Sequence, residues 1–292
     1  MRIVNLAADL SPIYPDGYFD LACWEQSLRA ADPDLAALCL ADMQADIKAG
    51  LIRFEEHLLP VLHAAYAAAD IRAQAIASFE AVTSGLEKRI RQAVGCPVEA
   101  DIILYPGLCN AAGWVTRLRG QDVILLGMEK IVELRWQNID AMRGLILHEL
   151  GHVYQRQQGI LEQDFSTSRE RYLWQLYTEG VAMHFEQLLI GELDYFHQDH
   201  DGWANWCRDH LLTLAQDFFA DLEAMRPDNQ RYFGDWVSYH GRGDTGYYLG
   251  ARFVDFICQG RPFSSILDLE IADIENLYQS FLHTLLSKEA SI

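Results

Sequence analysis

The sequence predicts an α+β protein that is predominantly helical and has a small sheet near its middle. Apolar residues recur at helical spacing through residues 18–94. Two short runs, at residues 100–105 and 123–127, are rich in β-branched and aliphatic residues, as buried strands are. We therefore expect a helical N-terminal region over residues 1–96 and a mixed region over residues 97–292, or one continuous domain containing both.

Length, composition and charge limit the function classes. The chain has 292 residues, half of them hydrophobic, and a net charge of −19, which disfavours nucleic acid or an anionic membrane as the main partner. The charge would suit a basic substrate, although solubility is the simpler explanation. Six cysteines form no C-x-x-C pair and no apolar run reaches eighteen residues, so we expect reduced thiols, no membrane span and a cytoplasmic location.

The N-terminal region reads as three helices. Asp32-Pro33 is a good helix start, because Pro is favoured at the first helical position. A second helix is expected at about residues 50–70, with a kink near Pro60. A third, rich in alanine, is expected at about residues 71–94. We interpret this region as a scaffold.

The next segment is expected to form a β-hairpin. Apolar runs surround a polar turn at residues 119–122, and two strands around that turn would pair. Peptidases commonly bind an extended substrate by adding it as a strand to an exposed sheet edge. An ordinary core hairpin is the alternative interpretation.

A helix predicted over residues 141–158 follows, with Asn138 or Asp140 as its N-cap. It contains the sequence HELGH, in which His148 and His152 lie on one helical face and can bind the same metal ion. Glu149 lies about 100° further round the helix and can reach a water on that ion. Gly151 costs about 1 kcal/mol relative to Ala within a helix, which indicates that something approaches closely there. We predict a zinc site whose third ligand this pattern leaves open.

Residues 170–190 form a second strongly helical segment that offers three candidates for the third ligand. Glu179 lies among apolar residues, where a lone charge is costly unless it binds a cation. Glu186 lies seven residues further on and could share the same face, so it is the second candidate. His184 is the third.

The spacing of these residues is similar to that of the gluzincin zinc peptidases, in which a glutamate from a following helix is the third ligand. The resemblance is closest to predicted zinc-dependent proteases with E-G-x-A and G-Y-x-x-G helices, matched here by residues 179–182 and 246–250. It covers about residues 105–255. Met183 departs from the pattern, because many gluzincins have an aspartate four residues after the ligand.

The resemblance implies a zincin-like catalytic region with Glu179 as the third zinc ligand. Asn110 and Ala111 resemble the edge-strand pair with which thermolysin-like members hold the substrate backbone. The candidate donors to the oxyanion are Tyr247, Tyr248, His240 and Arg242, and one tyrosine of the pair is expected only to pack. The resemblance favours Tyr247, and His240 is the next candidate. His197 and His200 lie near two aspartates and could bind an ion, but we interpret this polar segment as a solvated loop.

We therefore predict a zinc-dependent peptide hydrolase in which Glu149 is the general base. Its partner would be a peptide or protein substrate. A non-catalytic zinc-containing binding protein is one alternative, although a structural zinc has no use for the Glu149 carboxylate. Hydrolysis of a non-peptide amide is the other, and the oligomeric state is left open.

Overall fold

The computed structural model describes residues 1–234 and 236–290. It is 61% helical with one four-stranded sheet, which confirms the predicted α+β, mostly helical class. The chain forms two compact units, Met1–Glu149 and Leu150–Ile292, and the division falls inside one continuous helix. The boundary predicted between residues 96 and 97 lies within the first unit. In the described part of the chain, no helix is both long and apolar enough to cross a membrane.

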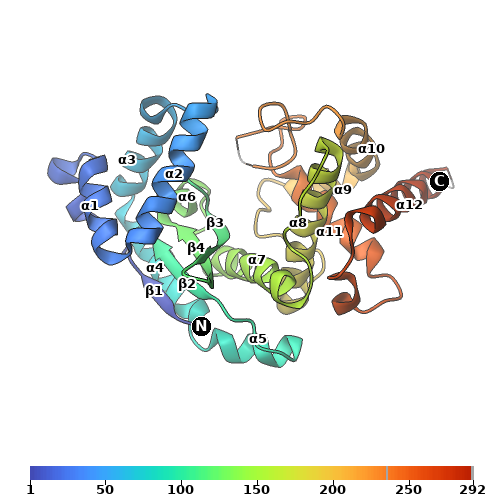
Figure 1. Ribbon diagram of the computed structural model, residues 1–292, viewed down its shortest axis with the longest axis horizontal. Helices are drawn as coiled ribbons and strands as arrows, with labels where there is room; N and C mark the ends of the chain where they lie inside the picture. The colour runs from blue at the N-terminus through green and yellow to red at the C-terminus, as the bar shows by residue number, and fades with distance from the viewer. Residues whose placement is uncertain (235, 291–292) are drawn as a thin grey trace. The chain divides into compact units, whose positions relative to one another are not determined.

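Helices fill most of the first 94 residues (Figure 1). The predicted helix start at Asp32-Pro33 is confirmed, since the Asp32 side chain accepts hydrogen bonds from the amides of Asp34 and Leu35. The predicted third helix is instead two helices, because Gly85 adopts a left-handed conformation with φ of 65°. The elements are α1 (Leu21–Ala31), α2 (Pro33–Ala49), a π-helical turn (Phe54–Leu58) that leads into α3 (Leu59–Ala67), α4 (Ala69–Thr83) and α5 (Leu86–Val94), preceded by 3₁₀ turns at Ser11–Ile13 and Pro15–Gly17.

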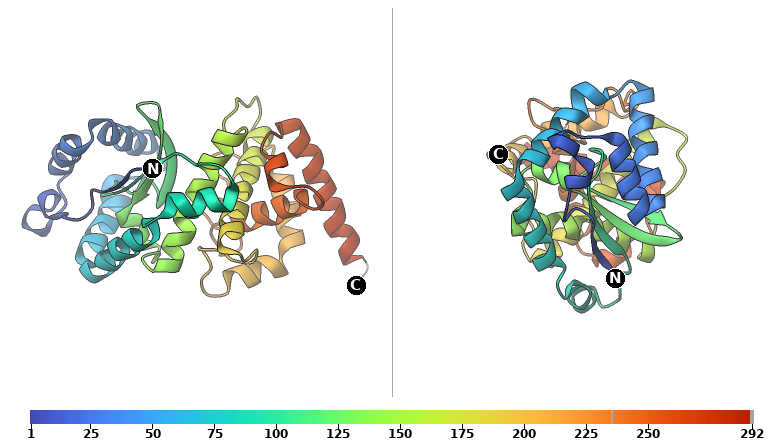
Figure 2. Two further views of the ribbon diagram at one scale, coloured as in Figure 1. Left: turned by 90° about the horizontal axis from the view of Figure 1, so that it is seen from below. Right: turned by 90° about the vertical axis from the view of Figure 1, so that its left-hand side faces the viewer.

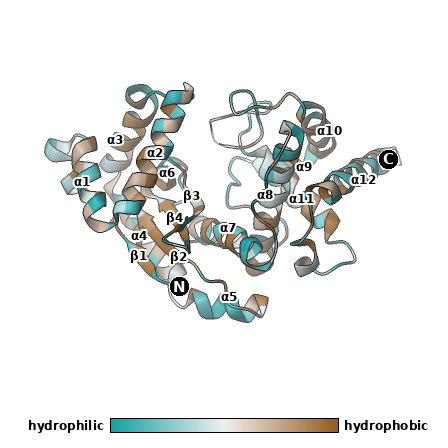
Figure 3. Ribbon diagram, in the orientation of Figure 1, coloured by the Kyte–Doolittle hydropathy of each residue, from teal (hydrophilic) through white to brown (hydrophobic). Residues whose placement is uncertain are grey.

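The sheet has the order β1-β2-β4-β3, with bounds Ile3–Asn5 (β1), Asp101–Tyr105 (β2), Gly113–Leu118 (β3) and Gln121–Gly127 (β4). The strands β1, β2 and β4 run parallel, whereas β3 and β4 form the predicted antiparallel hairpin, with Leu118 opposite Gln121. The strand β1 was not predicted. The central strands β2 and β4 are almost wholly buried, and the sheet is mainly hydrophobic in Figure 3. The strand β3 is therefore an edge of this sheet.

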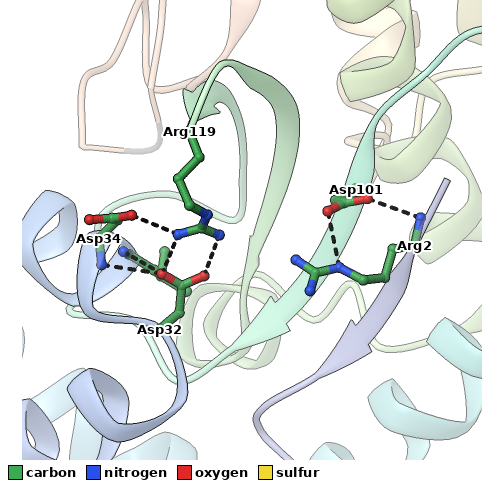
Figure 4. A network of polar contacts seen from close by, with 6 residues as sticks. Arg2, Asp32, Asp34, Asp101 and Arg119 are labelled. Atoms are coloured by element: carbon green, nitrogen blue, oxygen red, sulfur yellow. Dashed lines mark hydrogen bonds and ion pairs between the residues drawn. The ribbon is translucent and has the colours of Figure 1, made fainter.

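The tip of the hairpin is held against the start of α2 (Figure 4). Arg119 donates to both carboxylate oxygens of Asp32, at 2.9 and 2.8 Å, and to Asp34 at 2.8 Å. Arg2 makes a similar pair of bonds to Asp101, which fixes β1 beside β2. The edge strand is thus anchored at its far end by a charged network.

Two further helices complete the first unit and begin the second. The short helix α6 (Met128–Glu133) packs against α3 and α4. The helix α7 (Ile139–Gln158) begins after Asn138, whose side chain accepts from the amides of Asp140 and Ala141. Of the two predicted caps, Asn138 is the one used.

The second unit is helical. The helices α8 and α11 lie side by side (Figures 1 and 2), and α12 packs against both. His210 separates two helices within residues 203–221. The elements are α8 (Ser168–Ile190), α9 (Trp203–Asp209), α10 (Leu211–Asp221), α11 (Thr245–Ile257), a 3₁₀ turn (Phe263–Ile266) and α12 (Ile271–Glu289).

Candidate metal centre

The two histidines of α7 and one glutamate of α8 converge. His148 is buried, whereas His152 and Glu179 are partly exposed. One ligand atom from each of the three residues lies within 4.8 Å of the other two. Because α7 is one continuous helix, His148 and His152 lie one turn apart on the same face. These three residues could hold a metal ion.

The glycine in the HELGH sequence allows α7 and α8 to approach closely. A Cβ atom added at Gly151 would lie 2.7 Å from the Cα of Ala182 and 3.1 Å from the Cβ of Phe185. Those distances are too short for any side chain, so the predicted close approach at Gly151 is confirmed. The contact places His152, the next residue, opposite the turn of α8 that carries Glu179.

A second pair of glycines brings α11 onto α8. A Cβ at Gly180 would lie 2.2 Å from the carbonyl oxygen of Gly250, and one at Gly250 would lie 2.6 Å from the carbonyl oxygen of Leu176. The two helices therefore touch backbone to backbone, beside Glu179. At Gly246, the ring of Phe233 takes the place of a side chain. Neighbouring elements thus occupy the space beside both Gly246 and Gly250.

The donor set fits a metal ion of moderate size. Ligands at 2.0–2.2 Å from a tetrahedral zinc are separated from one another by about 3.3–3.6 Å. The Nε2 atom of His152 lies 3.3 Å from Oε2 of Glu179, which matches that spacing. A simple ion pair would explain this contact alone, but it would not explain why buried His148 joins the group. Two imidazoles and one carboxylate also leave further coordination positions for water or substrate.

The two other candidates for the third ligand contact different partners. Both carboxylate oxygens of Glu186 lie 3.0 Å from Nδ1 of His197, and both side chains are buried, with exposures of 0 and 1%. Nδ1 of His184 lies 2.8 Å from Asp255. The interpretation of His197 as part of a solvated loop is wrong, because its side chain is 1% exposed and pairs with Glu186 of α8.

The side chain of Glu149 lies beside the start of the edge strand. A Cβ at Gly113 would lie 2.5 Å from Oε1 of Glu149 and 2.8 Å from a methyl carbon of Leu145. Gly113 is the first residue of β3, so the absence of a side chain there makes room for the Glu149 carboxylate. A chain added to the edge of β3 would begin next to this carboxylate.

Asn110 and Ala111 lie in the loop that leads into β3. The Asn110 amide group donates to the carbonyl of Cys39 at 3.1 Å and to Asp42 at 2.7 Å. Its oxygen accepts from the amide of Leu108 at 3.0 Å. Both the oxygen and the NH₂ group of the Asn110 side chain are therefore occupied by hydrogen bonds that stabilise the loop. Contact with substrate through these two residues stays a prediction.

The two tyrosines of α11 differ in their surroundings. Tyr248 is buried and stacks on Phe196 with ring centroids 5.0 Å apart, as expected for the packing member of the pair. Tyr247 is partly exposed and contacts the edge of the Phe233 ring. His240 is exposed on a tight turn with φ of 50°. The catalytic roles of Tyr247 and His240 stay predictions.

One buried carboxylate near this region was not singled out from the sequence. Glu129, at the start of α6, is 4% exposed and accepts hydrogen bonds from the amides of Gly107 and Cys109. Glu129 lies among apolar residues in the sequence, as Glu179 does, and the same reasoning could have identified it.

Comparison with known proteins adds no identification. No protein-family model, curated protein or solved structure matches the chain.

Proposed function

We propose that this protein is a zinc-dependent peptide hydrolase of the gluzincin type. The observation that carries the proposal is the convergence of His148, His152 and Glu179 within 4.8 Å, with Glu149 next to the first ligand and outside the ligand group. Two neutral imidazoles and one carboxylate are a zinc-ligand set found in catalytic sites, where a fourth position stays open. Zinc bound there would polarise the scissile carbonyl and lower the pKa of a bound water from 15.7 toward about 7.

Glu149 would act as the general base. Its carboxylate would accept a proton from the attacking water and deliver it to the leaving amine. It follows His148 directly in the helix, about 100° round the axis, so it is near the ligands without sharing their face. Gly113 supports this role because it leaves space for the carboxylate at the start of β3.

A peptide or protein substrate would extend β3. An edge strand offers unpaired backbone groups to an extended chain, and an added strand would pass the Glu149 carboxylate. Tyr247 is the third residue of α11, the helix whose Gly250 contacts α8 closely, and its hydroxyl is proposed to donate a hydrogen bond to the developing oxyanion. The charge of −19 disfavours nucleic acid as the substrate. Six free cysteines are in keeping with a cytoplasmic location, which is part of the proposal.

The test joins metal analysis with one substitution. The purified protein is expected to contain about one zinc per chain and to cleave members of an unbiased peptide library. Glu149→Gln should keep the zinc and the fold while lowering turnover by about 10²–10⁴-fold, the usual contribution of a positioned acid or base. Zinc content, circular dichroism and mass-spectrometric detection of cleavage products measure these effects.

Glu162→Gln is the matched control. Glu162 is an exposed carboxylate just beyond the end of α7, and it pairs with Arg156 of α7, the helix that carries Glu149. Glu162→Gln should leave turnover unchanged. Zinc binding without cleavage of any peptide would favour the non-catalytic binding protein. Full activity of Glu149→Gln would remove the proposed general base.

A further inference from the structure

The Glu129 carboxylate accepts hydrogen bonds from two backbone amides, those of Gly107 and Cys109, in the loop that precedes the edge strand. We call this pair of bonds the Glu129 clasp. Oε2 of Glu129 accepts from the amide of Gly107 at 2.9 Å, and its Oε1 accepts from the amide of Cys109 at 3.0 Å. The carboxylate is buried, and burial raises its pKa while the backbone amides oppose that rise. An apolar residue would fill this position at lower cost. Unlike an apolar side chain, a carboxylate has two acceptor oxygens, which can bind two backbone amides of one turn.

A further side-chain hydrogen bond stabilises the turn that Glu129 binds. The amide between the two clasped ones, that of Leu108, donates to the Asn110 side chain. Cys109 adopts a left-handed conformation with φ of 60°, which is unfavourable for a residue other than glycine and persists only where surrounding contacts fix it. A Cβ at Gly107 would lie 2.3 Å from Oε1 of Glu129. Gly107 therefore permits the clasp.

The clasped turn leads directly to Glu149. The carbonyl of Ala112 accepts from the amide of Gly127, and the carbonyl of Ala111 occupies the space that a side chain at Gly127 would need. The next residue is Gly113, beside the Glu149 carboxylate. The six residues of the loop Gly107–Ala112 are thus held at both ends. A shift at the clasp would move the start of β3 relative to Glu149.

We propose that Glu129 is a positioning residue that fixes the loop Gly107–Ala112 and thereby aligns the substrate-binding start of β3 with Glu149. The inference rests on the proposed peptidase function. Glu129 touches neither the ligand group nor the attacking water in this assignment. Its loss should therefore weaken substrate binding without reducing metal affinity.

Glu129→Gln tests this, because it keeps the shape of the side chain and replaces one acceptor oxygen with an NH₂ group that cannot accept an amide hydrogen. Amide hydrogen exchange at Gly107 and Cys109 should become faster. KM for a cleaved peptide should rise about tenfold or more with a smaller change in kcat, as expected when binding shared by the ground and transition states is lost. Zinc content should not change.

Glu133→Gln is the matched control on the same helix, since Glu133 is exposed and pairs only locally with Lys130. It should behave as the parent protein in all three measurements. If Glu129→Gln does not fold, Gly107→Ala disrupts the clasp from the loop side and should raise KM in the same way.

Failure of this inference and failure of the proposed function would give different results. Faster exchange at Gly107 and Cys109 with an unchanged KM would reduce Glu129 to a structural role and overturn the inference while leaving the peptidase intact. A parent protein and a Glu133→Gln variant that both lack peptidase activity would overturn the proposed function, and this inference with it.

Discussion

Two glutamates of α8 each pair with a histidine, and the two pairs differ in ways that separate a structural pair from a candidate metal site. His152 and Glu179 are 3.3 Å apart, with side chains 13 and 16% exposed. His197 and Glu186 are 3.0 Å apart, with exposures of 1 and 0%. The first pair has a further potential ligand, His148, within 4.8 Å. The second belongs to no such group among the residues that the structure describes.

The difference lies in access and in the number of converging donors. A buried imidazole that donates one hydrogen bond to a carboxylate stabilises that carboxylate directly. Burial lowers the pKa of His197 to about 3, so this imidazole is neutral beside Glu186 near pH 7. A pair that solvent can reach, and that a third donor joins, can exchange a metal ion and a substrate. The Glu186 pair therefore serves folding, and the Glu179 pair is the one that could hold a metal ion.

Removing His197 should have the largest effect on stability. His197→Leu deletes a donor from a fully buried carboxylate, and breaking a buried pair by removing one partner costs about 3–5 kcal/mol of unfolding free energy. Urea denaturation of the zinc-free protein measures this. His200→Leu, in the same loop at an exposed position, should change the unfolding free energy by less than about 0.5 kcal/mol. Equal stabilities for the two variants would contradict the structural assignment.

The same comparison explains which parts of the site could be predicted from the sequence. The HELGH pattern is local, because the helix alone brings His148 and His152 together. Glu179 could be ranked above Glu186 by its apolar neighbours and by the resemblance. The burial of His197 could not be predicted, because the polar sequence around it, HQDHD, is typical of a solvated loop. Its inward packing depends on contacts of Phe196 with Trp203 and Tyr248.

The fold, like the site, has features that adjacent residues determine and features that distant contacts determine, and only the first kind could be predicted. The Asp32-Pro33 cap and the hairpin turn are signals carried by adjacent residues. The cap is confirmed, and the hairpin forms with a shorter turn than the predicted 119–122, since β4 already begins at Gln121. The strand β1 is only three residues long, and it pairs with Ile102–Leu104, about a hundred residues further along the chain. No local pattern identifies such a strand. Its neighbours in the sheet determine its conformation.

Matched substitutions on α8 test the assignment of the metal ligand. Glu179→Gln should weaken zinc affinity by more than about 10²-fold, because the loss of a direct ligand exceeds the 10–100-fold effect of losing a partner of a ligand. Glu186→Gln makes the same chemical change seven residues away and should leave zinc affinity essentially unchanged. Competition with a chelator of known affinity measures both. Loss of zinc in Glu186→Gln with retention in Glu179→Gln would reverse the assignment.

The smallest expected effect is a dependence of stability on pH that originates from His197. The unfolded chain binds a proton at this residue below about pH 6.5, whereas the folded protein does so only near pH 3. Between these values the unfolded state binds more protons, so stability falls as the pH falls. For one such group the loss between pH 7 and pH 5 is about 1–2 kcal/mol.

His197→Asn separates this contribution from that of the other histidines, because asparagine keeps an N–H group for Glu186 and does not titrate. Unfolding free energies from urea denaturation at pH values between 7.5 and 5 should fall less steeply for the variant than for the parent. Since all other titrating groups are common to both proteins, the difference between the curves reports on position 197 alone. His200→Asn should follow the parent curve closely. Parallel curves for His197→Asn and the parent would mean that the imidazole gains its proton in the folded state as readily as in the unfolded chain, and the assignment of a closed, neutral pair would then fail.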